Sequence, residues 1–165
     1  MKGQVDVRTR VRAPLERTFV LFATQINTWW KRGPRFRFGE GREGNLILEP
    51  WVGGRFFERF VDAPDCVIGR VDVWEPPRAG TSTCRLVLAW SPPEGGREAS
   101  KLEVRFKTVA GGTEVHLQHR GLEKHPGKSG TGLRSTALRN VKAVWWADLV
   151  RSFSHTHRHG GQCGS

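Results

Sequence analysis

The sequence lacks several features that would assign it to a class of protein at once. It has no tyrosine, one methionine and three cysteines in 165 residues. The cysteines form no CxxC pair, which argues against a disulfide framework or a zinc knuckle, so we expect Cys66, Cys84 and Cys163 to be thiols in a reducing compartment. No apolar run approaches the ~20 residues that a membrane-spanning helix needs. These absences favour a globular protein without a structural metal or a membrane span.

Acidic residues are also scarce. The chain has 16 Asp and Glu against 27 Lys and Arg, for a net charge of +11. Such an excess could attract nucleic acid, an anionic membrane or an acidic protein. The basic residues are spread along the chain in short runs, whereas nucleic-acid binders concentrate them on one arm or helix. We therefore expect no nucleic-acid partner and keep an acidic protein partner as an alternative.

The chain is long enough for one domain with a substantial core. We expect this domain to cover residues 1–154 and the His- and Gly-rich tail, residues 155–165, to be disordered. Met1 leads straight into the polar segment from Lys2 to Arg12, which does not resemble a signal peptide, so we expect a cytoplasmic protein. An edge strand such as Val5 to Val11 could support a homodimer, and the sequence leaves monomer and homodimer open.

Alternation of apolar and polar residues predicts a mainly antiparallel β protein. The clearest alternation runs from Leu102 to Phe106, and Gly111-Gly112 then predicts a tight hairpin into a strand from Thr113 to Arg120. Further strands are predicted over residues 5–11, 46–50, 55–61, 69–74 and 86–90. The sequence therefore predicts about six to seven successive strands.

Helical spacing predicts two short helices after the first strand and one long helix near the end of the chain. The first begins near Pro14 and is expected to bury Leu15, Phe19, Val20 and Phe22, and the second spans Ile26 to Lys31. The long helix is predicted from Gly132 to about His155, with the following buried face: Leu133, Ala137, Leu138, Val141, Val144, Trp145 and Leu149. Trp146 points ~100° away from Trp145, so we expect it at a cavity mouth or on the surface.

Several short motifs fall in an order that resembles a known superfamily. They are Trp29-Trp30, Gly53-Gly54-Arg55, Gly69-Arg70-Val71 before Glu75-Pro76-Pro77-Arg78, Arg85-Leu86-Val87, Trp90, Gly112-Thr113 and His119-Arg120-Gly121-Leu122. This set resembles the START-like or SRPBCC superfamily, and within it the subgroup named for the activator of heat-shock-protein-90 ATPase homologue. The resemblance implies an α+β helix-grip fold, in which a curved antiparallel sheet wraps around a long C-terminal helix and leaves a hydrophobic cavity.

The inward faces of these elements define the expected cavity wall. We predict that it contains Trp30, Phe57 or its neighbour Phe56, Trp74, Leu88, Trp90, Phe106, Leu117, His119, Val141 and Trp145. Ligand sites combine apolar walls with a few polar groups that orient the ligand, and His119 and Glu58 would be those groups here. The alternative is that the aromatic residues only fill the core and that His119 bonds to the backbone or to a carboxylate.

Motifs for catalysis or cofactor binding are missing. Gly127-Lys128-Ser129 lacks the spacing of a phosphate-binding loop, because Gly121 lies one residue too far upstream. His155, His157 and His159 with Cys163 have no HExxH or CxxC arrangement, so we expect no metal and no cofactor.

The leading hypothesis from the sequence is a non-enzymatic module that binds a small hydrophobic or aromatic molecule. One alternative is a protein-interaction module related to chaperone ATPase activators. The other is a cyclase- or hydrolase-like enzyme, in which His119 and Glu58 would perform acid-base catalysis.

Overall fold

One antiparallel sheet of seven strands forms the frame of the molecule. The computed structural model describes residues 4–33, 35–39, 41–91, 100–121 and 144–153. The sheet order is β1-β7-β6-β5-β4-β3-β2. The strands are β1 Val5–Val11, β2 Asn45–Leu48, β3 Arg55–Arg59, β4 Cys66–Glu75, β5 Thr83–Trp90, β6 Ser100–Val109 and β7 Gly112–Arg120. The strands from β2 to β7 pair in chain order, and every pairing is antiparallel, as the alternation predicts.

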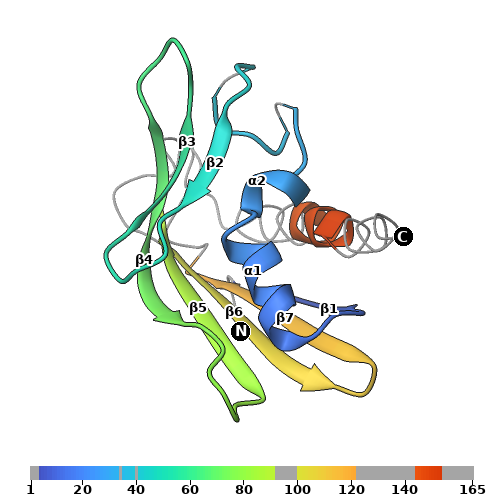
Figure 1. The fold of residues 1–165 in the computed structure, drawn as a ribbon. Coiled ribbons are helices and arrows are strands. Elements are labelled where there is room, and N and C mark those ends of the chain that lie inside the picture. The colour runs from blue at the N-terminus through green and yellow to red at the C-terminus, as the bar shows by residue number, and fades with distance from the viewer. Residues whose placement is uncertain (1–3, 34, 40, 92–99, 122–143, 154–165) are drawn as a thin grey trace, which may run out of the picture.

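The first strand joins the sheet beside the last. β1 pairs with β7 in a register that places Val5 opposite His119 and Val11 opposite Thr113. The sheet curls, so that its two faces differ in shape (Figure 1). The helices lie on the concave face, and the convex face is turned away from them. The curled antiparallel sheet that the sequence predicts is therefore confirmed.

Two short helices follow β1 and cover part of the concave face. α1, Leu15–Ala23, contacts β5, β6 and β7, and α2, Ile26–Trp29, contacts β2. The buried side of α1 includes Phe19 and Phe22, as predicted, but not Val20, which is 39% exposed. Val20 is only one position from Phe19, so it points about 100° away from that residue on the helix.

Residues 144–153 are helical and also lie on the concave side (Figure 1). Their buried residues Trp146, Leu149, Val150 and Phe153 recur at the steps of one helical face. The sequence-based prediction of this face was wrong in two places, since Val144 is 56% exposed and Trp146 is fully buried. The buried face is thus rotated toward Trp146. Residues 132–143 of the predicted helix lie outside the described residues.

Two irregularities in β4 set which residues reach the concave side. The register with β3 shifts between Phe56 and Phe57, and the register with β5 shifts between Val71 and Val73. A β-bulge of this kind moves the residues beyond it to the other face of the sheet and increases the local twist.

No helix within the described ranges is long and apolar enough to cross a membrane.

Candidate functional site

Four tryptophans from three parts of the chain meet on the concave face. Trp30 follows α2, Trp90 ends β5, and Trp145 and Trp146 lie in the helical segment 144–153. The ring centroids of Trp30 and Trp146 are 5.9 Å apart, those of Trp90 and Trp146 are 5.5 Å apart, and those of Trp145 and Trp146 are 4.8 Å apart. Aromatic contacts of this geometry stabilise beyond the area that they bury. We call Trp30, Trp90, Trp145 and Trp146 the indole cluster.

Glycine makes room for the indole cluster on the sheet. Gly69 of β4 pairs with Phe56 on one side and with Trp90 on the other. A Cβ atom at this position would collide with the carbonyl oxygen of Ala89. The rings of Phe56 and Trp90 approach to 6.0 Å across the glycine. The site therefore needs a residue without a side chain at position 69.

A buried histidine connects the indole cluster to the sheet by hydrogen bonds. His119 of β7 is fully buried, and its Nδ1 accepts a hydrogen bond of 3.0 Å from the indole N–H of Trp146. Its Nε2 lies 2.7 Å from Oγ of Ser100, and the Ser100 hydroxyl donates to the carbonyl oxygen of Trp90 at 3.3 Å. Ser100 is the first residue of β6, lies directly opposite Trp90 in β5 and is also buried.

These partners determine which imidazole nitrogen carries the proton. An indole N–H can only donate, so Nδ1 of His119 must be the acceptor and Nε2 must carry the hydrogen in the neutral ring. Nε2–H then donates to Ser100, whose own hydroxyl hydrogen points to Trp90. In this arrangement His119 cannot accept a proton from Ser100, so the pair does not form an activated nucleophile.

The loop between α2 and β2 accepts hydrogen bonds from two members of the indole cluster. The indole N–H of Trp30 donates to the Phe36 carbonyl at 2.8 Å, and that of Trp145 donates to the Arg35 carbonyl at 2.7 Å. Arg35 also forms an ion pair of 3.0 Å with Asp148 in the helical segment. The loop is thereby bound both to Trp30 and to the helical segment 144–153. The Phe36 ring in this loop is buried and contacts Trp145.

Glu58 and Arg37 stabilise the same loop by hydrogen bonds to its backbone. The Glu58 carboxylate accepts hydrogen bonds from the backbone N–H groups of Phe38 and Gly44, at 2.9 and 3.1 Å, and lies 3.9 Å from Arg37. Arg37 in turn donates to the carbonyl oxygens of Lys31, Trp30 and Gly44. Burial lowers the pKa of Arg37 below its ordinary value, and the Coulombic attraction of Glu58 opposes this shift. Both carboxylate oxygens of Glu58 therefore serve the loop.

Most of the residues predicted for the cavity wall share one buried cluster. This cluster contains Trp30, Leu88, Trp90, Phe106, Leu117 and Trp145. His119 is buried beside it through its ring contacts with Trp90 and Trp146. Trp74 is half-buried against the same cluster and meets Phe19 edge to face at 5.1 Å. Val141 lies outside the described residues.

Phe57 does not lie with the others. Its ring is on the convex side, beneath the guanidinium groups of Arg55 and Arg59, at 4.2 and 5.0 Å from their carbon atoms. Phe56, the alternative that the sequence left open, contacts Trp30 and Trp90 instead. Two adjacent phenylalanines in a strand face opposite ways, and only the pairing with β4 decides which one faces inward.

Two residues of the site were not predicted. Ser100 could have been found, because it continues the inward alternation of Leu102 and Val104 by one step. Trp146 could have been found from its seven-residue spacing to Phe153, which places both on one helical face.

Within the described ranges no group of three His, Cys, Asp or Glu side chains could hold a metal ion. The histidines of the tail lie outside those ranges.

Comparison with solved structures identifies the architecture. CalU16 from Micromonospora echinospora superimposes with a TM-score of 0.59 at 18% identity, over 94% of this chain and 74% of that one. DynU16, a protein in the dynemicin biosynthetic locus, gives a TM-score of 0.61 at 19% identity, over 97% of this chain and 49% of DynU16. The chain shares the helix-grip fold.

A third solved structure is more similar in sequence. The anthrahydroquino-γ-pyrone synthase Txn09 is 27% identical, with a TM-score of 0.57, over 93% of this chain and 96% of that one. No protein-family profile matches the chain. No curated protein matches it either. These neighbours support the helix-grip, SRPBCC-type architecture that the sequence motifs imply, and the heat-shock-protein-90 activator subgroup stays a prediction.

Proposed function

We propose that the protein binds a small, planar, aromatic molecule on the concave side of the sheet, beside the helical segment 144–153. The observation that carries this proposal is the indole cluster around a neutral, hydrogen-bonded His119. Indole rings offer flat apolar area, and a site of this kind orients its ligand with few polar groups. The similarity to Txn09 and to a protein of the dynemicin biosynthetic locus supports a polycyclic ligand.

The charges of the site favour an uncharged ligand. The buried ion pair beside the cluster, between Arg37 and Glu58, is engaged by the loop backbone, and Arg35 at the edge of the cluster is paired with Asp148. Moving a charged ligand out of water to an aromatic wall without a free counter-ion is unfavourable. A neutral quinone or phenol loses much less solvation and can stack on the indoles.

A cyclase-like enzyme is the second candidate, and the sequence similarity to the synthase Txn09 favours it. Ring closure of a flexible substrate can be accelerated by holding it in a reactive conformation without a strong acid or base. His119 would take up a proton only by giving up its bond from Trp146, so we expect positioning to matter more than acid-base catalysis. The chaperone-related interaction module stays a prediction.

Native mass spectrometry of the freshly purified protein is the first test. A stoichiometric adduct of defined mass, released on denaturation, supports a ligand site and gives its chemical class. A high-resolution structure in which side chains fill all the space between sheet and helix would overturn the proposal.

A direct titration uses emodin, a trihydroxyanthraquinone, as the probe. We expect quenching of tryptophan fluorescence that saturates at one equivalent. Trp145→Phe removes one indole at the edge of the cluster and should weaken binding about tenfold. Trp51→Phe is the matched control, since Trp51 is 54% exposed and is not part of the cluster. Equal affinity for both variants would place the probe elsewhere, and conversion of a linear polyketide substrate would favour the enzyme.

A further inference from the structure

The convex face of the sheet carries a row of basic residues. Arg85 of β5 is directly opposite Arg105 of β6, Arg105 is opposite His116 of β7, and His116 is opposite Arg8 of β1. Cross-strand neighbours of like charge repel each other and destabilise a sheet. Arg85 and Arg105 are neighbours of this kind, so their repulsion needs compensation from elsewhere.

Carboxylates at the edges of the row supply this compensation. Glu103 lies 3.0 Å from Arg85 and 3.3 Å from Arg105, and Glu75 lies 3.3 Å from Arg85. Partial burial raises the pKa of Glu103, but the hydrogen bonds and the Coulombic attraction of both arginines together outweigh it and hold the pKa below its ordinary value. At the other end, Glu114 is 3.7 Å from Arg8. Asp6 contacts His116 at 2.6 Å and accepts a hydrogen bond from Gln118, so each of these carboxylates already has a partner.

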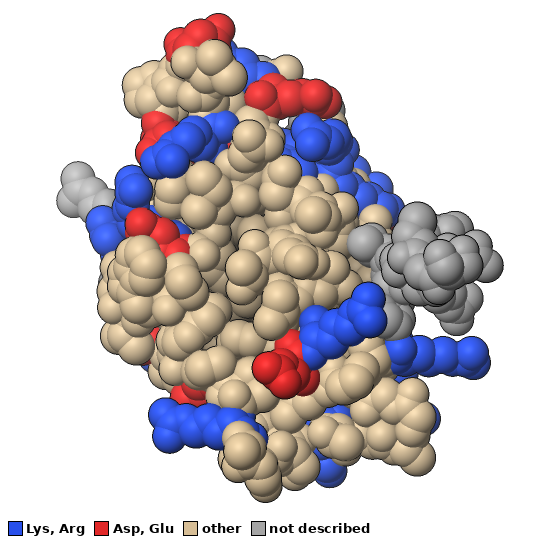
Figure 2. All heavy atoms as spheres, viewed as in Figure 1, with Lys and Arg blue, Asp and Glu red and all other residues tan. Residues whose placement is uncertain are grey.

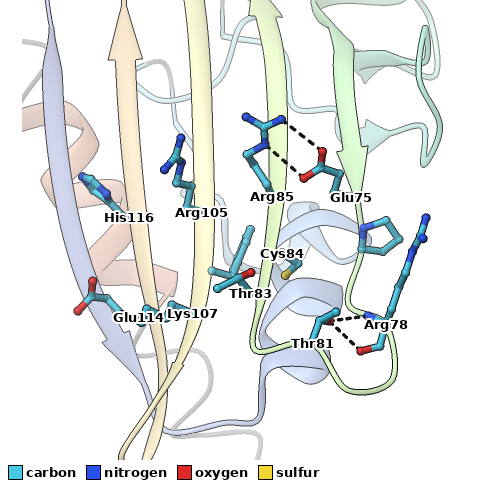
Figure 3. Close-up of a pocket in the computed structure, with 12 residues that line it drawn as sticks. Glu75, Arg78, Thr81, Thr83, Cys84, Arg85, Arg105, Lys107, Glu114 and His116 are labelled. Carbon is cyan, nitrogen blue, oxygen red and sulfur yellow. Dashed lines mark hydrogen bonds and ion pairs between the residues drawn. The ribbon is translucent and has the colours of Figure 1, made fainter.

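A hollow on this face contains cations that these carboxylates do not reach. It has a volume of about 720 Å³, and Figure 3 shows the side chains that surround it. The permanent cations of its wall are Arg78, Arg85, Arg105 and Lys107, and the carboxylates are Glu75 and Glu114. Among the described residues, neither Arg78 nor Lys107 forms an ion pair. The wall therefore has a net positive charge.

Hydroxyl groups complete this wall. The Thr81 hydroxyl donates to the Arg78 carbonyl at 2.8 Å and accepts from the Arg78 N–H at 3.1 Å, which fixes the turn that carries Arg78. Thr83 is directly opposite Lys107, and its hydroxyl has no hydrogen bond among the residues that the structure describes. An ammonium group, a guanidinium group and a free hydroxyl at one hollow are suitable donors for phosphate oxygens.

We propose that this hollow, called the convex pocket below, binds a small molecule that carries phosphate groups. A polyphosphate spreads several negative charges over a few ångströms, which matches cations on the β4–β5 turn and on β6. The pocket volume is sufficient for a nucleotide-sized molecule. This site is independent of the concave site, since the two lie on opposite faces of the sheet.

Isothermal titration calorimetry with inorganic pyrophosphate and with ADP tests the proposal. At ~50 mM salt we expect saturable binding of one equivalent, with weaker binding at higher salt because exposed charges are screened. Arg105→Gln/Lys107→Gln should weaken it at least about tenfold. The matched control is Arg17→Gln/Arg42→Gln, which removes the same charge from exposed positions on α1 and in the α2–β2 loop.

Amide chemical shifts provide the second readout. Saturable shifts centred on residues 83–85, 105–107 and 114–116, with affinity lost only in the pocket variant, support the convex pocket. Tighter binding of ADP than of pyrophosphate indicates a nucleotide as the source of the phosphate, and the reverse indicates a free polyphosphate. Equal losses in the pocket and control variants show attraction to overall charge and overturn the proposal. No binding by the wild-type protein up to about 10 mM ligand also overturns it.

Discussion

The two faces of the central strands use opposite chemistry, although alternate residues of the same strands build both. On β5 and β6 the inward residues Leu86 and Val104 are fully buried, whereas their neighbours Arg85 and Arg105 point outward and form ion pairs. The difference arises because successive side chains of a strand point to opposite faces. A single alternating segment can thus build an apolar wall and a charged surface together.

The faces also solve the problem of polar groups differently. The concave face pairs neutral groups, such as His119, Ser100 and Trp146, because a buried charge would be costly. The convex face balances ions that remain in contact with water. Figure 2 shows Lys and Arg side chains mostly toward the periphery of the view, while residues without charge cover most of its centre. The exception is the ion pair of Arg37 and Glu58, which is buried beside the concave site.

The buried ion pair of Arg37 and Glu58 gives the largest expected effect on stability. Glu58→Ala leaves the buried Arg37 guanidinium without its counter-ion and two backbone N–H groups without their acceptor. We expect a loss of about 3–5 kcal/mol in the free energy of unfolding, measured by urea denaturation. Glu114→Ala, which breaks the exposed pair with Arg8, should cost less than about 1 kcal/mol. Similar losses for both variants would remove the distinction between the faces.

Cysteine reactivity probes the two faces at adjacent positions of β5. Cys84 is buried on the concave side, and burial raises the pKa of its thiol from 9.0 to about 12. The thiolate is the reactive form, so in a Cys66→Ser/Cys163→Ser background we expect Ellman's reagent to react at least about 100-fold more slowly than with the unfolded chain at pH 8.

The control for this measurement moves the thiol to the other face. Thr83→Cys/Cys84→Ser in the same background places the thiol at an exposed position one residue away. It should react nearly as fast as the unfolded chain. Rapid reaction of Cys84 itself in the native state, at a rate independent of denaturant, would contradict its assignment to the buried face.

The neutral hydrogen-bond chain gives an intermediate effect. Trp146→Phe keeps an aromatic ring but removes the N–H that His119 accepts, which should cost about 1–3 kcal/mol of unfolding free energy. Nitrogen-15 NMR of His119 should show the Nε2–H tautomer in the wild-type protein and a changed Nδ1 shift in the variant. Trp51→Phe should leave both measurements unchanged. A wild-type His119 with its proton on Nδ1 would contradict the assigned hydrogen-bond directions.

The smallest effect is expected at Asp6 on the convex face. Partial burial raises the pKa of Asp6, but hydrogen bonds from Gln118 and His116, together with the Coulombic attraction of His116 and Arg8, lower it below its ordinary value of 3.8. Its contribution to stability is therefore present above the unfolded-state pKa and is lost as the pH falls through the folded-state pKa. Asp6→Asn should cost less than about 1 kcal/mol at pH 6, and thermal unfolding should show this difference disappear toward pH 3. A difference that grew in acid would reverse the sign assigned here.

Much of the fold could be predicted from local pattern. The alternation in β6 and β7 and the glycine pair between them fix two strands and their hairpin, because these signals concern neighbouring residues only. The helical spacing of Phe19 and Phe22 in α1 is equally local. The predicted site was less certain, since the sequence could only name inward residues and not their partners.

The sequence by itself determined which residues are able to face inward, because side-chain direction has a fixed period in a strand or a helix. Tertiary structure decided the rest. Pairing with β4 selected Phe56 over Phe57, since adjacent residues of a strand face opposite ways and the register decides which of them faces inward. The hydrogen bond from Trp146 to His119 joins the last helical segment to β7, and only the folded chain brings these two residues together. Both contacts join residues far apart in the chain, so a local pattern can indicate which side chains are able to face inward but not which partners they meet.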